Sequence, residues 1–296
     1  MRHEPGHGKR LSYYEFGATS LFACQMDQRF SYCLYIPRAY DEDGTNDYPL
    51  VVLIHGTERG AQRYRDEFIE FAEQHQCIVL APLFPCGILK PGELDNYKFI
   101  RYQTIRYDEI LLSMVAEISA RYRLNGARFL IHGFSGGGHF VHRFLYLHSE
   151  RLAGASIGAP GLVTLLDPGK PWWVGTGNLR AEFGIEVDLA KIRKVPVQMV
   201  VGAADTETWE ITPDDKSPRW MPGINDAGKT RIERLQALHR CFLGHGIGVR
   251  FDLVPNVGHE GWDPALLARV KDFFASTLGG KTPLQAHSGS AAPVKS

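Results

Sequence analysis

The sequence predicts an α/β protein built on a mostly parallel sheet with helices on both faces. Short and almost wholly apolar runs, such as Leu50–Ile54 and Cys77–Ala81, are typical of strands that are buried on both faces. Longer segments with apolar residues at helical spacing, such as Tyr107–Arg123, alternate with these runs. Alternation of strands and helices favours parallel strands that are joined by crossover helices.

The strands are expected in a regular order along the chain. Leu21–Met26 and Arg29–Pro37 come first and predict an antiparallel pair at one edge, because their apolar residues alternate. The buried runs Leu50–Ile54 and Cys77–Ala81 follow. The later strands are expected at Ala127–His132, Ala155–Ile157, Val197–Val201 and Val249–Val254.

The helices are expected between these strands. Their apolar residues recur every three or four positions, as Phe140, Phe144 and Leu147 do in one of them, which predicts one buried stripe on each helix. Besides Tyr107–Arg123, the helices are expected at Gln62–His75, Gly137–His148, Lys229–Leu243 and Pro264–Leu278.

The domain organisation is predicted to be simple. Residues 11–278 form one domain between a flexible N-terminus, residues 1–10, and a small, polar, disordered tail, residues 279–296. Two long segments, about 158–194 and 206–228, interrupt the strand–helix alternation. Long segments in compact α/β proteins are often lids or binding loops, and we expect that role here.

Composition excludes several classes of protein. Of the 296 residues, 44% are hydrophobic, which excludes a wholly disordered chain. Lysine and arginine number 33, as do aspartate and glutamate, so no basic excess points to nucleic acid or to an anionic membrane. The apolar runs are too short for a membrane helix. A homo-oligomer is left open.

Cysteine usage and the first residues favour a cytoplasmic protein. The five cysteines are odd in number and none are spaced as CxxC, so we expect reduced and mostly buried thiols. A Cys77–Cys86 bridge is left open. Residues 1–10 are polar and lack the apolar stretch of a secretory signal.

The strongest chemical signal is the segment Gly133–Gly137, which fits the pattern G-x-S-x-G around Ser135. An apolar strand runs directly into it and an amphipathic helix leaves it. This strand–turn–helix context predicts a nucleophile elbow, in which glycines avoid clashes with neighbouring backbone. The alternative is a glycine-rich helix start with Ser135 as its N-cap.

A serine nucleophile needs a base and an acid. His259 follows the last strand and is the predicted base, because its loop can reach back over the strand ends. Asp205 follows the strand before it and is the predicted acid that orients the histidine. Glu207 and Asp252 are the reserve candidates for the acid.

The oxyanion of a tetrahedral intermediate needs backbone N–H donors. The residue after the nucleophile, Gly136, is expected to supply one. The loop that begins His55-Gly56-Thr57 follows a buried strand and is expected to supply the other from the Thr57 amide. The alternative for this loop is a tight strand-to-helix turn without a chemical role.

Taken together, Gly133–Gly137, His55-Gly56, Asp205 and His259 resemble the α/β-hydrolase family in type, order and placement. The resemblance runs from about Pro49 to Leu278. It is strongest to the esterase branch that includes polyhydroxyalkanoate-depolymerase-like and feruloyl-esterase-like serine hydrolases. It implies an α/β-hydrolase fold with an eight-stranded, mostly parallel sheet and lid insertions. It also implies a Ser–Asp–His triad with neither cofactor nor metal.

Candidate substrate contacts lie in the two long segments and in the irregular stretch Leu83–Arg106. Trp172, Trp173 and Trp209 predict an aromatic pocket if the segments fold over Ser135, and Arg101 is a candidate partner for an acidic substrate group. The alternatives are tryptophans that pack the segments onto the body and an arginine in a surface ion pair.

These inferences predict a serine hydrolase of the carboxylesterase class that cleaves a small or oligomeric ester through an acyl-enzyme. Amide, thioester and carbon–carbon bond hydrolysis use the same triad and stay open. A ligand-binding homologue without catalysis is the alternative from another class of protein.

Overall fold

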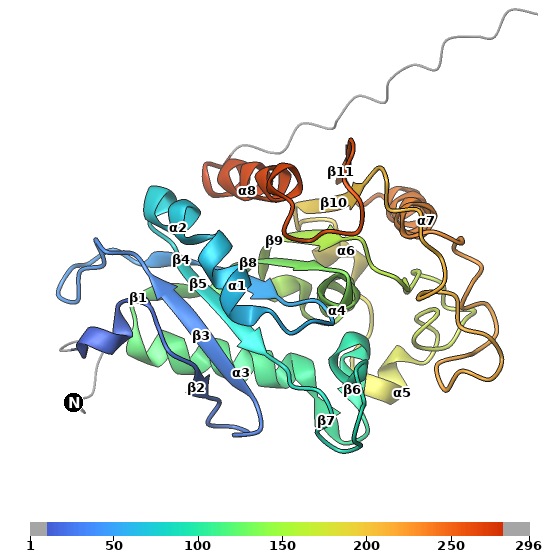
Figure 1. Ribbon diagram of the computed structural model, residues 1–296, viewed down its shortest axis with the longest axis horizontal. Coiled ribbons are helices and arrows are strands. Elements are labelled where there is room, and N and C mark those ends of the chain that lie inside the picture. The colour runs from blue at the N-terminus through green and yellow to red at the C-terminus, as the bar shows by residue number, and fades with distance from the viewer. Residues whose placement is uncertain (1–10, 281–296) are drawn as a thin grey trace, which may run out of the picture.

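The computed structural model describes residues 11–280, and its centre is one nine-stranded sheet (Figure 1). The strands are β1 (Gly17–Ala18), β2 (Phe22–Ala23), β3 (Ser31–Ile36), β4 (Tyr48–Ile54), β5 (Ile78–Leu83), β8 (Leu124–Phe134), β9 (Leu152–Gly158), β10 (Val197–Gly202) and β11 (Val249–Val254). They follow the order β1-β3-β5-β4-β8-β9-β10-β11, with β2 also paired to β3. The expected flexible N-terminus and disordered tail lie outside the described residues, apart from residues 279 and 280.

The predicted mostly parallel α/β sheet is confirmed. The six strands from β5 to β11 pair in parallel, and β1, β2 and β3 form the antiparallel edge. The sheet has one strand more than the eight expected, because β1 and β2 pair separately with the two halves of β3. The small hairpin β6 (Arg101–Tyr102) and β7 (Ile105–Arg106) lies apart from this sheet.

Helices cover both faces of the sheet, with α1, α2 and α8 on one face and α3 and α4 on the other (Figure 1). The helices are α1 (Ala61–Glu67), α2 (Ile69–His75), α3 (Tyr107–Arg121), α4 (Gly136–His148), α5 (Leu179–Phe183), α6 (Leu189–Ile192), α7 (Arg231–Gly244) and α8 (Pro264–Leu278); short 3-10 turns lie at Tyr13–Glu15, Asn96–Phe99 and Ser149–Arg151. The single helix expected over 62–75 is broken, because Phe68 leaves helical geometry and is fully buried.

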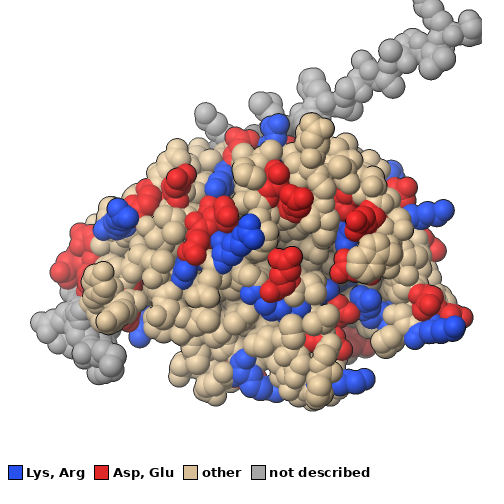
Figure 2. Space-filling model, viewed as in Figure 1, with Lys and Arg blue, Asp and Glu red and all other residues tan. Residues whose placement is uncertain are grey.

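Acidic and basic side chains are mixed over the face drawn in Figure 2, in keeping with 33 of each kind in the chain. All five cysteines are free; Cys77 is buried while Cys86 is exposed, so no Cys77–Cys86 bridge forms. Within residues 11–280, none of the helices has the length and apolar character needed to cross a membrane.

The two long segments are fastened to the body by a buried arginine of α7. The guanidinium of Arg234 donates to the carbonyl oxygens of Gly161 and Gly228 and to the side chain of Asn225. Gly161 belongs to the first segment and the other two acceptors to the second. Since Arg234 is fully buried, this contact holds both segments against the body. Their role as lids stays a prediction.

Buried histidines make the fold sensitive to acid. Burial lowers the pKa of His55 and His132 to about 3 and lowers the pKa of His139 and His142 well below the ordinary value. A histidine of an unfolded chain titrates near 6.5. Between these values the unfolded chain binds more protons than the folded one, so the free energy of unfolding falls as the pH drops.

We therefore predict that His132→Phe flattens this pH dependence. Each buried neutral histidine contributes up to about 1.4 kcal/mol per pH unit to the slope, and the variant removes one of them. Urea denaturation of the wild type and the variant between about pH 4 and 6 measures both slopes. Equal slopes would contradict the assignment of His132 as a neutral buried group.

Candidate active site

Four of the predicted site residues lie at one edge of the sheet. Thr57 follows β4, Ser135 follows β8, Asp205 follows β10 and His259 follows β11. These four strands are parallel, so their carboxyl ends meet at the same edge. In open α/β sheets this edge is where ligands bind.

Ser135 stands in a strained turn between β8 and α4. Its backbone is at φ 56° and ψ −115°, a region that side-chain-bearing residues rarely adopt. Its N–H donates to the carbonyl oxygen of Gly158 on the neighbouring strand. Although it occupies the N-cap position of α4, its side chain makes no capping hydrogen bond. The hydroxyl is therefore available for chemistry.

The glycines on either side permit this turn. A Cβ on Gly133 would overlap the backbone of Gly137, and a Cβ on Gly137 would overlap the carbonyl oxygen of Ile54. The helix thus starts in direct backbone contact with the end of β4. This close approach is the physical reason for the G-x-S-x-G pattern.

Asp205 and His259 form a hydrogen-bonded pair. The Nδ1 of His259 lies 2.7 Å from the Oδ2 of Asp205, whose side chain is fully buried. The His259 ring packs on Phe134 with 5.0 Å between ring centroids and is partly exposed toward the pocket. A carboxylate on Nδ1 fixes the tautomer whose Nε2 can accept a proton. The reserve acids lie elsewhere: Asp252 pairs with Arg250, and Glu207 accepts from Trp209.

The two predicted oxyanion amides are neighbours. A Cβ placed on Gly136 would lie 3.3 Å from the backbone nitrogen of Thr57. The Tyr97 hydroxyl borders the same spot and donates to the carbonyl oxygen of His55 at 2.9 Å. The Nε2 of His55 accepts from the backbone N–H of Phe84. These contacts hold the loop after β4 beside the start of α4.

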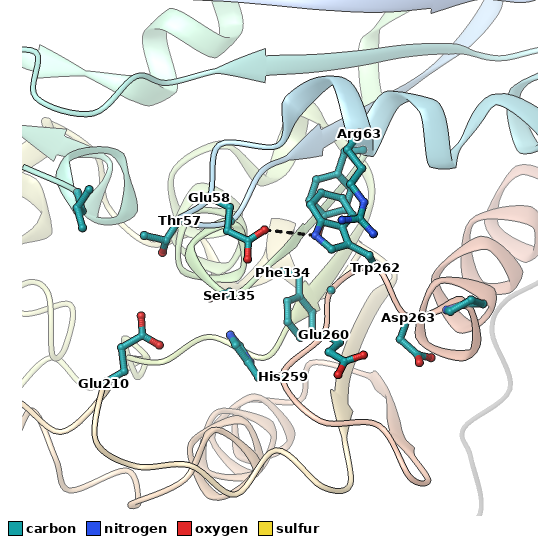
Figure 3. Close-up of a pocket in the computed structure, with 15 residues that line it drawn as sticks. Thr57, Glu58, Arg63, Phe134, Ser135, Glu210, His259, Glu260, Trp262 and Asp263 are labelled. Carbon is teal, nitrogen blue, oxygen red and sulfur yellow. Dashed lines mark hydrogen bonds between the residues drawn. The ribbon is translucent and has the colours of Figure 1, made fainter.

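A pocket of about 670 Å³ opens in front of these residues. Figure 3 shows Ser135 between the loop that carries Thr57 and Glu58 and the loop that carries His259. The lining is formed by loops at the sheet edge and the start of α1 and α8: Gly56, Thr57, Glu58, Arg63, Tyr64, Leu94, Phe134, Ser135, Glu210, His259, Glu260, Gly261, Trp262, Asp263 and Pro264. A much smaller recess also reaches Ser135 and is lined by Lys98, His139, Arg219 and Arg231 among others.

Comparison with solved structures agrees with this architecture. A poly(3-hydroxybutyrate) depolymerase, LpqC from Bordetella parapertussis, superposes with a TM-score of 0.65 at 23% identity, over 86% of this chain and 87% of that one. Poly(aspartic acid) hydrolase-1 from Sphingomonas sp. KT-1 gives a TM-score of 0.65 at 20% identity, over 86% and 97% of the two chains. This protein has the α/β-hydrolase fold.

A further solved structure is similar at lower sequence identity. An S-formylglutathione hydrolase from Agrobacterium tumefaciens gives a TM-score of 0.56 at 17% identity, over 84% of this chain and 89% of that one. Neither a family model nor a curated protein sequence matches the chain. At these identities the likeness shows the α/β-hydrolase fold, and chemistry has to be argued from the site.

None of the four predicted substrate contacts is among the residues that line this pocket. Trp172 is buried and packs edge-on against Phe183, and Trp173 packs on Phe99. Trp209 is 78% exposed, and Arg101 pairs with Glu182 on the surface. These positions favour the packing and surface alternatives, and the substrate roles of the four residues stay predictions.

Three residues near Ser135, Asp205 or His259 were not singled out from the sequence. Tyr97 comes from the 3-10 turn before β6, Glu210 from the second long segment, and Arg231 from the first turn of α7. Arg231 donates to Asp205 at 3.2 Å and to Glu210 at 2.7 Å. Only the strand order of the α/β-hydrolase fold brings these segments together, so no local motif marks them.

The backbone contact at the elbow generates a prediction about stability. Gly137→Ala places a methyl group against the Ile54 carbonyl oxygen, where backbone cannot give way easily. We expect a loss of about 1–3 kcal/mol in the free energy of unfolding, measured by urea denaturation.

Gly248→Ala is the matched control for that measurement. A Cβ at Gly248 would meet no atom within 4 Å, and its φ lies outside the left-handed region. Its stability should stay within about 0.5 kcal/mol of the wild type. Similar losses in both variants would show that the elbow contact is not special.

Proposed function

We propose that this protein is a serine hydrolase that cleaves a carboxylic ester through an acyl-enzyme. The single observation that carries the proposal is the shared pocket of Ser135 and His259. Ser135 stands there at φ 56°, and the His259 ring is held by Asp205 at 2.7 Å. An activated nucleophile needs a base that is itself oriented by a third group, and this arrangement supplies both.

The proposed reaction has two halves. The Ser135 Oγ attacks the ester carbonyl while the Nε2 of His259 takes its proton, and the Gly136 and Thr57 amides bind the oxyanion. The intermediate collapses, and His259 gives the proton to the departing alcohol. A water molecule then loses a proton to His259 and attacks the acyl-enzyme. The second tetrahedral intermediate collapses, His259 returns the proton to the Ser135 Oγ, and the carboxylic acid leaves.

The pocket supports a substrate of moderate size. About 670 Å³ falls in the range of sites that take small or oligomeric ligands. Phe134 and Trp262 give it aromatic walls, and Leu94 and Pro264 add apolar surface. The solved structures with this fold include a poly(3-hydroxybutyrate) depolymerase and a poly(aspartic acid) hydrolase. Their names support hydrolysis, so the test below includes both ester and amide substrates.

Labelling with a fluorophosphonate probe tests the nucleophile. We expect one adduct on the wild type by intact-mass spectrometry and none on Ser135→Ala, since the probe reacts with an activated serine. Ser113→Ala is the matched control and should label like the wild type, because Ser113 lies on α3, where its hydroxyl bonds Glu117. A well-folded wild type that takes no adduct would contradict the proposal and favour a ligand-binding protein.

Panels of esters, amides and thioesters with matched acyl groups then test the reaction class. We expect ester turnover to exceed amide turnover and to disappear in Ser135→Ala. A labelled wild type that cleaves only amides or thioesters would keep the nucleophile and overturn the ester.

A further inference from the structure

The triad acid has a second side-chain partner that links it to the substrate pocket. One carboxylate oxygen of Asp205 accepts from the His259 ring at 2.7 Å, and the other accepts from the Nη1 of Arg231 at 3.2 Å. The Nη2 of Arg231 donates to Glu210 at 2.7 Å. We propose that Arg231 is a positioning residue of the triad and that it couples Asp205 to Glu210 at the pocket wall.

Burial makes this link strong. The side chains of Arg231 and Asp205 are 3% and 0% exposed, whereas that of Glu210 is 51% exposed. Charge-assisted hydrogen bonds are stronger in such an environment than on the surface. The backbone of Arg231 is held as well. Arg231 is the first residue of α7, and a capping box between Thr230 and Glu233 stabilises the N-terminus of that helix. The backbone that carries the Arg231 guanidinium is therefore fixed in place.

The geometry explains why an arginine is needed. Its planar guanidinium offers separate N–H groups to two carboxylates, one on each side, which a lysine ammonium does not do with the same directionality. With Oδ1 held by Arg231, the Oδ2 of Asp205 stays directed at His259. The proposal rests on the proposed function, because positioning matters only if His259 acts as the base.

The charge of Arg231 acts on the same histidine. A nearby positive charge disfavours the protonated imidazolium, so the loss of Arg231 makes protonation of His259 easier. The loss of the Glu210 charge leaves Arg231 less neutralised and has the opposite effect. The other charged groups at the pocket are Glu58, Glu260, Asp263 and Arg63, and Lys98 and Arg219 lie at the small recess. These groups are the same in every variant compared.

The pH profile of kcat/KM tests the coupling. In Arg231→Gln we expect the acid limb to move to higher pH and kcat to fall by about tenfold or more, because a small displacement of a catalytic group is costly. In Glu210→Gln the acid limb should move to lower pH. Arg231→Lys should keep the limb near its wild-type position and still lose kcat, since it retains the charge but not the bridging geometry.

Arg250→Gln is the matched control. Arg250 also joins two carboxylates, Asp252 and Asp272, at 2.8 and 2.7 Å, but it lies on β11 away from the pocket. Its acid limb and kcat should equal those of the wild type. Acid limbs that coincide in Arg231→Gln, Glu210→Gln and the wild type would overturn the proposal.

A measurement without turnover separates this proposal from the proposed function. The His259 ring resonances, assigned with His259→Asn, are followed by NMR across the pH range in each variant. The midpoint should move up in Arg231→Gln and down in Glu210→Gln even if no substrate is cleaved. A fixed midpoint overturns the coupling, whereas an inert wild type with moving midpoints overturns only the proposed function. Glu210→Gln keeps the test open if Arg231→Gln fails to fold, because Glu210 is half exposed.

Discussion

The site depends on the direct backbone contact between the first turn of α4 and the end of β4. Gly137 lies against the carbonyl oxygen of Ile54, and Gly133 lies against Gly137. This contact sets the sharp turn that holds Ser135 at positive φ. It also fixes how close the amides of Gly136 and Thr57 come to each other. Without it, the helix would start farther from the sheet, and the two proposed oxyanion donors would not converge beside the serine.

The parallel sheet brings the other residues of the site to the same edge as this contact. Because β4, β8, β10 and β11 run in the same direction, the loops after them share one edge. Each strand needs to contribute only one residue at its end. The strained serine, the buried carboxylate and the histidine are then held by different strands of one rigid sheet, which suits groups that must keep a fixed geometry.

Much of this arrangement could be predicted from the sequence, because its signals are local. The apolar runs that became β4, β5 and β8 to β11 carry their own burial pattern, and α8 and β11 match the expected bounds. Ser135 directly follows β8, and Asp205 and His259 lie in the loops after β10 and β11, so their placement needed only the strand direction. The break at Phe68 was missed because both halves of the helix keep the same apolar spacing.

The contacts that depend on distant segments could not be predicted in the same way. Arg231 reads as an ordinary first-turn residue of an amphipathic helix, and Glu210 as one of several charges in a long segment. Likewise, Trp172 is buried against Phe183 and the partly buried Trp173 packs on Phe99, and aromatic composition alone does not say which side of a segment faces a pocket.

Buried arginines explain how the long segments are attached to the body. Arg234 binds backbone carbonyls of both segments, and Arg143 binds the Thr164 hydroxyl and the Lys98 carbonyl while it packs over Phe99. Burial lowers the pKa of these two guanidinium groups, to about 10 for Arg234 and about 9 for Arg143. Both keep their charge at neutral pH, and their neutral oxygen partners must compensate for the lost hydration.

Arg231 differs because its partners are carboxylates, and one of them is Asp205, the acid of the proposed triad. Of these three attachments, only the one through Arg231 places a full charge between the long segment and Asp205. A change in how that segment sits therefore reaches Asp205 as an electrostatic change as well as a displacement.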